Sequence, residues 1–308
     1  MSLARSLLLR ASKSHWLAHN VMRRPFAMRA VRKFMPGEEL SDALAAAQGL
    51  ASEGLGSVLT KLGENLNDLS EADQVRDHYL DAYDQIKQHG LPSVVSVKPT
   101  QLGLDHSYDA CVAHLEMLAA KAASVGSTLW IDMEDSSYVD RTLNLYRTLK
   151  ARHEKVGLAL QSYLRRTPDD LKSLLPLRPI IRLVKGAYAE PPHIAYPDKR
   201  DTDLSYYQLA DTLLAAAVRG EAHPIFGTHD MGLIDRINAR AGQLGVKNGS
   251  YEIHMLYGIR MDAQRTLARA GRTVATLISY GSAWWPWYMR RLAERPANVW
   301  FVMKSVVS

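Results

Sequence analysis

Short apolar runs alternate with longer amphipathic segments along the chain from about residue 54 onward. Runs rich in β-branched residues predict strands, and apolar residues that recur every three or four positions predict helices. Eight strands are predicted in this way, at residues 57–62, 93–98, 128–133, 156–162, 180–185, 224–228, 251–255 and 272–278. A helical segment follows each strand, and the first of these helices, at 71–89, has Ser70 as its predicted N-cap.

Eight strand–helix units in about 250 residues are typical of a (β/α)8 barrel. The alternative for such a pattern is an open, doubly wound sheet, but no GxGxxG turn follows the first predicted strand. The sequence therefore predicts an α/β fold in which residues 51–308 form one TIM-type barrel. Residues 1–50 are predicted to form a helical arm outside this barrel.

Positive charge is concentrated in the predicted arm. The 308-residue chain has a formal net charge of +6, and residues 1–37 contain eight basic residues and no acidic one. An amphipathic basic segment of this kind is found in organelle transit peptides, in helices that lie on membrane surfaces and in arms folded on a protein body. We expect the folded arm, which is compatible with weak association with a membrane surface. The rest of the chain is slightly acidic, which argues against a nucleic-acid-binding protein.

Two features of the composition narrow the class of protein further. The only cysteine is Cys111, so the chain cannot form an internal disulfide or a cysteine-based zinc site. No uninterrupted apolar run approaches the length of a membrane span. We therefore expect a cytoplasmic protein, with peripheral association at the inner face of the membrane left open.

A barrel of this type carries its chemistry at the carboxyl ends of its strands. Polar residues at single strand ends are common, because these ends meet water. Here, however, charged or amide side chains lie at six successive ends: Glu64 and Asn65, Lys98 and Gln101, Asp132 to Asp135, Gln161, Arg182 and Lys185, and His229 and Asp230. The seventh predicted strand carries Glu252 and His254. The sequence therefore predicts an active site at this face of the barrel.

Several of these residues are also possible metal ligands, namely Asp132, Glu134, Asp135, His229 and His254. The predicted mouth contains many cations as well, which suit an anionic cofactor and a carboxylate substrate better than a divalent ion. No histidine or cysteine spacing typical of zinc is present. We expect no metal in the site.

A cluster of aromatic residues precedes an arginine pair, Arg290 and Arg291, near the end of the chain. Pro286 suits the first turn of the helix that carries this pair, because its missing N–H has no helical partner there. Arginine is suited to bidentate recognition of a carboxylate, and Glu294 is spaced to brace one guanidinium. The alternative is a solvated basic helix end, but the crowded aromatic rings favour a binding site.

The motifs at these positions resemble those of the proline dehydrogenase family, in order and over nearly the whole chain. The most specific are RLVKGAY at 182–188 and YMRRLAERPAN at 288–298. The others are LGEN at 62–65, SVKPTQLGL at 96–104, IDMED at 131–135, LQSYLRRT at 160–167, KRDTD at 199–203, GTHD at 227–230 and EIHMLYGI at 252–259. The resemblance implies an FAD-dependent (β/α)8-barrel enzyme of the short, monofunctional bacterial type.

The resemblance also implies roles for individual residues. Asp132 is expected beside the substrate amine and Arg182 near the flavin N5 edge, as the catalytic residues. The substrate carboxylate is expected to bind Lys98, Arg290 and Arg291. The pocket around the substrate is expected to be lined by Leu183, Tyr188, Leu277 and Trp287. Cofactor-binding roles are expected for Met133, Gln161, Arg182, Lys185, Gly186, Ala187, Lys199, Thr202, Thr228 and His229, and also for Glu294, which would help to hold the arginine pair.

Three positions depart from the pattern of the family. Tyrosines usual in the substrate pocket correspond here to Leu277 and Trp287, and a glutamine usual on the seventh strand corresponds to His254. Tyr280 or Tyr288 could supply a phenol from a neighbouring position. Otherwise the pocket has lost hydroxyl groups and changed shape while it keeps its cations for the carboxylate.

The resemblance implies oxidation of L-proline to 1-pyrroline-5-carboxylate by hydride transfer to flavin N5, with electrons passed to a quinone. FAD is expected to be non-covalent, because no His or Cys stands in a recognised flavin-linking context. The departures leave open the same chemistry on a substituted proline or a six-membered homologue. A flavin-binding barrel without catalytic activity is the alternative of another class.

Overall fold

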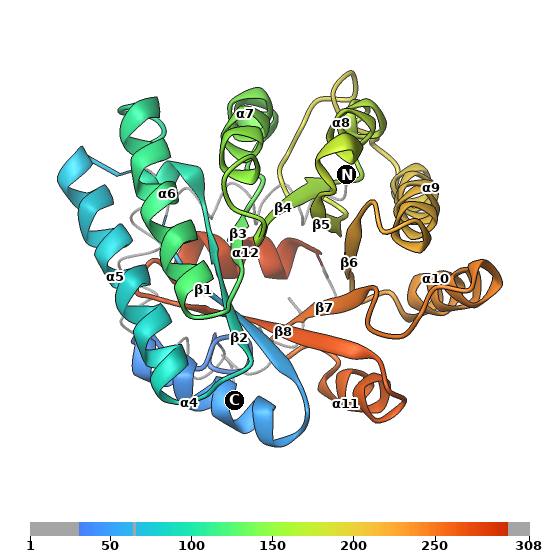
Figure 1. Cartoon of the computed structure of the whole chain (residues 1–308), viewed down its shortest axis with the longest axis horizontal. Coiled ribbons are helices and arrows are strands. Elements are labelled where there is room, and N and C mark those ends of the chain that lie inside the picture. Colours follow the sequence, from blue (N-terminus) through green and yellow to red (C-terminus); the bar gives the residue numbers. More distant parts are fainter. Residues whose placement is uncertain (1–30, 64–65, 295–308) are drawn as a thin grey trace, which may run out of the picture.

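The computed structural model describes residues 31–63 and 66–294, and for residues 290–294 it describes the backbone alone. Eight parallel strands close into a barrel in which each strand pairs with its neighbours in the chain (Figure 1). The strands are β1 Gly56–Lys61, β2 Ser93–Val97, β3 Leu129–Ile131, β4 Val156–Gln161, β5 Ile180–Val184, β6 His223–Gly227, β7 Glu252–Leu256 and β8 Thr273–Tyr280. The predicted α/β barrel is confirmed.

Helices surround the barrel and follow its strands in turn (Figure 1). They are α4 Leu40–Ser52, α5 Leu69–Gln88, α6 Tyr108–Ser124, α7 Val139–Lys150, α8 Thr167–Leu174, α9 Lys199–Val218, α10 Met231–Leu244, α11 Met261–Arg269 and α12 Trp284–Glu294. Short 3₁₀ turns lie at η1 Pro99–Leu102, η2 Ser136–Tyr138 and η3 Leu175–Leu177. Within these described residues, no helix combines the length and apolarity needed to span a membrane.

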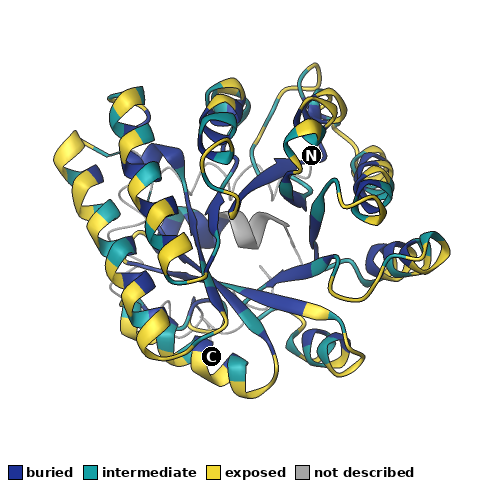
Figure 2. Ribbon diagram, in the orientation of Figure 1, coloured by how far each residue is buried: buried dark blue, intermediate teal, exposed yellow. Residues whose placement is uncertain are grey.

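The burial of the strands explains why the sequence pattern predicts them well. Most strand residues are buried, whereas each outer helix has one buried side and one exposed side (Figure 2). A strand covered on both faces is apolar along nearly its whole length, and an amphipathic helix shows a period of 3.6 residues. The two patterns therefore mark the two kinds of element.

The start of α5 differs in detail from the sequence prediction. Asp68, not Ser70, is the N-cap, and its Oδ1 accepts hydrogen bonds from the backbone N–H groups of Ser70 at 2.8 Å and Glu71 at 3.2 Å. The aspartate carboxylate also carries a negative charge, which is favourable at the positive end of a helix. The helix consequently starts at Leu69, two residues earlier than predicted.

The predicted N-terminal arm lies largely outside the described residues. Its last part forms α4, which packs against β1 and β8. The segment before α4 also contacts the last helix, because Trp284 Nε1 donates a hydrogen bond of 2.9 Å to Glu38 Oε1. Since α12 starts at Trp284, Pro286 lies in its first turn, as predicted.

The indole of Trp130 lies in the barrel interior, where it faces a glycine. Trp130 on β3 pairs with Gly157 on β4. A Cβ atom at position 157 would lie only 2.7 Å from the Trp130 ring. The absent side chain of Gly157 therefore provides the space that the indole occupies.

We expect Gly157→Ala to destabilise the fold by about 1–3 kcal/mol, because the Trp130 ring must shift to admit the methyl group. The matched control is Gly49→Ala in α4, where a new Cβ meets nothing within 4 Å. Glycine costs roughly 0.5–1 kcal/mol relative to alanine inside a helix, so this control should be stabilised. Urea unfolding measures both values. Equal stability of the Gly157→Ala protein and the wild type would show that the ring has room to spare.

Candidate active site

A buried ion pair lies at the carboxyl ends of the strands and joins three of them. Arg182 on β5 is only 3% exposed. Its Nη2 donates to Ser96 Oγ on β2 at 2.8 Å and to Asp132 Oδ1, just after β3. Ser96 Oγ donates in turn to Asp132 Oδ1 at 2.8 Å. Because these partners come from strands across the barrel, the Arg182 side chain must point into its interior.

The Arg182 guanidinium also contacts an aromatic ring, in addition to Asp132 and Ser96. Its Cζ lies 4.8 Å from the centre of the Trp130 ring, a cation–π arrangement. Burial lowers the pKa of Arg182, and the charge of Asp132 and its hydrogen bond oppose this effect. A guanidinium titrates so far above neutral pH that the group stays charged. Its other nitrogen, Nη1, is buried without a hydrogen-bond partner in the described part of the chain.

Gln161, at the end of β4, presents a second unpartnered polar atom. Its Nε2 donates to the Met133 carbonyl at 3.2 Å, which fixes the amide, while its buried Oε1 has no partner among the described residues. Buried polar groups are nearly always paired, so unpaired ones call for an explanation. A bound ligand that accepts from Arg182 and donates to Gln161 would satisfy both atoms.

Lys98 lies at the end of β2, in a turn that a buried carboxylate holds in place. Glu134 accepts hydrogen bonds from Thr100, from the backbone N–H at 3.1 Å and from Oγ1 at 2.6 Å. These bonds tie the residues after β2 to those after β3. Lys98 itself is half-buried, and its ammonium has no partner among the described residues. It is therefore available to an anion.

Two further predicted cations, Lys185 and Lys199, share two aspartates. Lys185 Nζ lies 2.5 Å from Asp203 Oδ1 and 3.2 Å from Asp230 Oδ2. Lys199 Nζ contacts Asp203 and lies 3.5 Å from Asp230. Burial acts to raise the pKa of each aspartate, but hydrogen bonds from the lysines hold both values below the usual range. The two lysine ammonium groups are therefore paired with two ionised aspartates. These aspartates were not among the predicted site residues, although the KRDTD and GTHD motifs contain them.

The backbone between these cations and the ion pair includes a position that only glycine can occupy. Gly186 has a φ of 113°. A Cβ atom there would lie 2.2 Å from the Tyr163 ring. Ala187 and Tyr188 follow it in half-buried positions. The absent side chain of Gly186 therefore provides the space that the Tyr163 ring occupies.

Three other predicted cofactor residues lie at nearby helix starts and strand ends. Thr202, in the first turn of α9, donates from Oγ1 to the Asp198 carbonyl at 3.2 Å. Thr228 is buried after β6, and its Oγ1 accepts from the N–H of Asp230 at 3.2 Å. His229 Nε2 accepts from the Leu256 N–H at 2.8 Å, so this nitrogen carries no proton.

The strand register directs Leu277 and Leu183 differently. Leu277 on β8 pairs with Leu256 on β7, two residues beyond His254. Side chains alternate along a strand, and these positions face the barrel interior. Leu183 follows the inward-facing Arg182, so alternation places its side chain on the helix side of β5, which argues against contact with a substrate. Leu256 is instead a pocket position that the sequence motifs did not single out.

Of the two tyrosines considered as replacements for the missing phenols, Tyr280 has a hydrogen-bond partner elsewhere, whereas the buried hydroxyl of Tyr288 has none in the described part of the chain. The Tyr280 hydroxyl lies 2.8 Å from His78 Nε2 on α5, outside the barrel. The ring of Tyr288 packs against Phe34 and Trp284. Trp287 is buried in α12. The side chains of Arg290, Arg291 and Glu294 lie outside the described residues, so their roles stay predictions.

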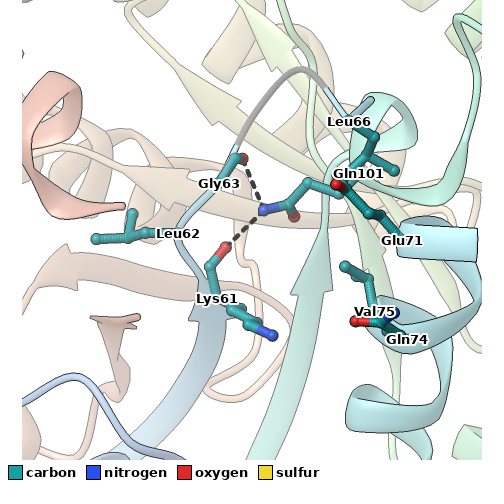
Figure 3. Close-up of a pocket in the computed structure, with 8 residues that line it drawn as sticks. All are labelled: Lys61, Leu62, Gly63, Leu66, Glu71, Gln74, Val75 and Gln101. Atoms are coloured by element: carbon teal, nitrogen blue, oxygen red, sulfur yellow. Dashed lines mark hydrogen bonds between the residues drawn. The ribbon is translucent and has the colours of Figure 1, made fainter. Parts of the chain in front are cut away.

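A cavity of about 330 Å³ lies beside this site, between the end of β1 and α5 (Figure 3). Gln101 closes one side of it and donates from Nε2 to the carbonyls of Lys61 at 2.9 Å and Gly63 at 2.7 Å. Gln101 was expected at the mouth as a polar strand-end residue, but none of the residues with an expected substrate or cofactor role lines this cavity. In the described residues, no three His, Cys, Asp or Glu side chains are arranged to hold a metal ion.

Comparison with known proteins places the chain in a family. Residues 43–304 match the family model for proline dehydrogenase. Proline dehydrogenase 1 of Bacillus subtilis strain 168 is 36% identical over 276 residues, which cover 90% of each chain. Proline dehydrogenase of Deinococcus radiodurans is 35% identical over 280 residues, covering 89% of each.

A solved structure agrees in fold. Proline utilization A from Bdellovibrio bacteriovorus superposes with a TM-score of 0.82 at 22% identity, over 94% of this chain and 36% of that longer protein. This chain thus spans little more than a third of that protein's length. The family model and the curated relatives, which match nearly end to end, show that the chain belongs to the proline dehydrogenase family of oxidoreductases.

Proposed function

We propose that the protein oxidises L-proline to 1-pyrroline-5-carboxylate with FAD as its cofactor. The observation that carries this proposal is the buried group of Asp132, Ser96 and Arg182, with unpartnered polar atoms on Arg182 and Gln161 at the same mouth of the barrel. Membership of the proline dehydrogenase family supports the choice of substrate. The division into an arm, 1–50, and an FAD-binding catalytic barrel, 51–308, is part of the proposal.

The residues at the mouth fit a flavin in their chemistry. The free donor of Arg182 and the free acceptor of Gln161 complement the alternating acceptors and donors of an isoalloxazine edge. Lys185 and Lys199 supply cations for the phosphates. When bound, FAD supplies a two-electron acceptor for hydride.

The chain's own residues would bind and orient the amino acid. Lys98 would bind its carboxylate together with Arg290 and Arg291, and charge-assisted contacts of this kind fix orientation as well as affinity. Asp132 is partly exposed at the mouth and would accept a proton from the substrate amine, which must be neutral before it can lose hydride. Arg182 would stabilise negative charge that develops beyond its free edge.

The proposed electron acceptor is a quinone dissolved in the membrane. The basic character of residues 1–37 supports this choice, because each cation near an anionic leaflet contributes about 1 kcal/mol. Weak, salt-sensitive association of a cytoplasmic protein with the inner face of the membrane would bring the barrel to its acceptor.

A second candidate is the same chemistry on a substituted proline or a six-membered homologue. The observation that favours it is the strand register, which turns the aliphatic Leu277 towards the interior while Tyr280 bonds His78 outside the barrel. A pocket that has lost a phenol there has room for extra carbon atoms. A non-catalytic flavin-binding barrel is disfavoured, because Lys98, Asp132 and Arg182 are all present.

The purified protein should be yellow, with FAD that is released intact when the protein is denatured, since no covalent link is expected. An absorption spectrum before and after denaturation and removal of the protein measures this. Colourless protein that cannot be reconstituted with FAD would contradict the proposal.

Lys98→Met should lower kcat/KM for L-proline roughly 10- to 150-fold, because a lost hydrogen bond to a charged group costs about 1.5–3 kcal/mol. The effect should appear mainly in KM, with FAD still bound. Lys172→Met on the exposed surface of α8 is the matched control and should leave kcat/KM unchanged. Equal kcat/KM for the two variants would show that Lys98 does not bind the substrate carboxylate.

Leu277→Tyr should shift specificity towards L-proline, because the larger ring fills the space that a longer substrate needs. One methylene in a pocket is worth roughly 10- to 200-fold in discrimination, so the ratio of kcat/KM for the six-membered homologue to that for proline should fall by at least about tenfold. Leu204→Tyr, at an exposed position of α9, is the control. An unchanged ratio in the Leu277→Tyr protein would show that this residue does not line the substrate pocket.

A further inference from the structure

Three titratable side chains form a chain of contacts inside the barrel, below the Arg182–Asp132 pair. His223 Nε2, at the start of β6, lies 2.9 Å from Glu252 Oε1 at the start of β7. Glu252 Oε2 lies 3.2 Å from His254 Nε2, two residues further along β7. His223 is partly exposed at the opposite end of the barrel, whereas His254 is only 4% exposed. The contacts therefore lead from solvent towards the active site.

The partners of His254 determine where its proton lies. Burial alone would raise the pKa of Glu252, but hydrogen bonds from His223 and His254 hold it far below the usual value, so the carboxylate is ionised. An ionised carboxylate only accepts hydrogen bonds, so His254 Nε2 must carry the hydrogen. Burial and the charge of Arg182 lower the pKa of His254 despite the opposing effect of Glu252, which keeps the ring neutral. Its Nδ1 is then an acceptor.

This acceptor and a nearby donor are both unsatisfied. His254 Nδ1 and Arg182 Nη1 are buried, and neither has a hydrogen-bond partner in the described part of the chain. Both side chains pack on the same Trp130 ring, His254 edge-on at 5.9 Å between ring centres and Arg182 over its face. Each atom supplies what the other lacks.

Two small residues lie beside His254 on the neighbouring strands. Gly227 at the end of β6 pairs with His254 on one side and with Val184 of β5 on the other. A Cβ atom at position 227 would lie 3.6 Å from Arg182 Cγ and 2.8 Å from Val184 Cγ1. Ala275, which also pairs with His254, is small as well. A buried water molecule needs at least two polar partners, and Arg182 Nη1 and His254 Nδ1 would supply them.

We propose that His254 is a positioning residue for Arg182, acting through one buried water that accepts one hydrogen of Arg182 Nη1 and donates to His254 Nδ1, while the second hydrogen of Nη1 is left for the ligand at the mouth. Asp132 and Ser96 hold Nη2 of the guanidinium from one side. The water, backed by the Glu252–His254 pair, anchors the other nitrogen. Two anchors over the Trp130 ring fix the plane of the cation. The consequence for catalysis rests on the proposed function, since it requires that this cation face a flavin.

The first test needs neither cofactor nor substrate. Nitrogen NMR of the cofactor-free protein labelled at histidine should show His254 as neutral, with its proton on Nε2 and none on Nδ1. His254→Gln assigns the signal by deleting it. Arg182→Met should shift the Nδ1 resonance, because it removes the partner of the bridging water. A protonated Nδ1 in the wild type, or an Nδ1 resonance that is insensitive to Arg182→Met, overturns the inference whatever the protein oxidises.

The second test compares two replacements in the FAD-loaded enzyme. Glutamine keeps a donor for Glu252 and an acceptor for the water, whereas methionine of similar size keeps neither. His254→Met should shift the equilibrium between oxidised and reduced flavin about tenfold towards the oxidised form, which is about 30 mV for a two-electron couple. It should lower kcat while KM for proline stays within about threefold. His254→Gln should restore both the potential and kcat.

The matched control is His153→Met, because His153 also bonds a carboxylate, Glu116, but lies on the outer surface. Its flavin potential and kcat should equal those of the wild type. Methionine and glutamine variants of His254 that behave alike would show that only its volume matters. If no flavin binds at all, the proposed function fails, while the NMR result still decides whether His254 positions Arg182.

Discussion

The positive charge of a guanidinium buried inside a closed barrel needs a partner of opposite charge. The residues of the candidate site are arranged around the partners of Arg182. An unpaired charge away from water costs several kcal/mol, so its partners are placed by necessity. Asp132 and Ser96 come from strands on the far side of the barrel, and they make the ion pair a cross-link between β2, β3 and β5. Closure of the sheet is what brings these three groups within bonding distance.

The same cation explains several small residues around it. Trp130 forms the floor under the guanidinium, and the indole fits only because Gly157 has no side chain. A side chain at Gly227 would collide with Val184, because its Cβ would lie 2.8 Å from Val184 Cγ1. Protein interiors are close-packed, so the Trp130 ring and the guanidinium can share one layer only if the neighbouring side chains are small. The glycines and the polar network thus both hold the Arg182 guanidinium over the Trp130 ring.

The sequence was sufficient to predict the barrel, and it grouped the candidate site residues at one face of it. Period-two and period-3.6 patterns mark elements by burial, and burial on both sides made the strands easy to recognise. The ends of parallel strands meet at one edge, so Lys98, Asp132, Gln161 and Arg182 could be grouped without coordinates. Alternation along β5 was also readable, and it would have turned Leu183 away from the interior.

What the sequence could not provide are pairings that depend on register and on rotamers. Nothing local indicates that Asp203 and Asp230 meet the same lysines, or that Tyr280 bonds His78, about 200 positions earlier in the chain. The N-cap of α5 was misplaced for a different reason, because Asp68 and Ser70 are both good capping residues and lie two positions apart. The roles of Arg290, Arg291 and Glu294 stay predictions.

The central claim is that this mouth oxidises a cyclic secondary amine and stores two electrons on a bound flavin. The most direct measurement is the visible spectrum of the FAD-loaded protein, mixed with L-proline without oxygen. The account predicts loss of the flavin absorbance with one equivalent of imine product per flavin, and a slower loss in Asp132→Asn with the same bound FAD. A spectrum that stays oxidised with L-proline, with substituted prolines and with the six-membered homologue would contradict it.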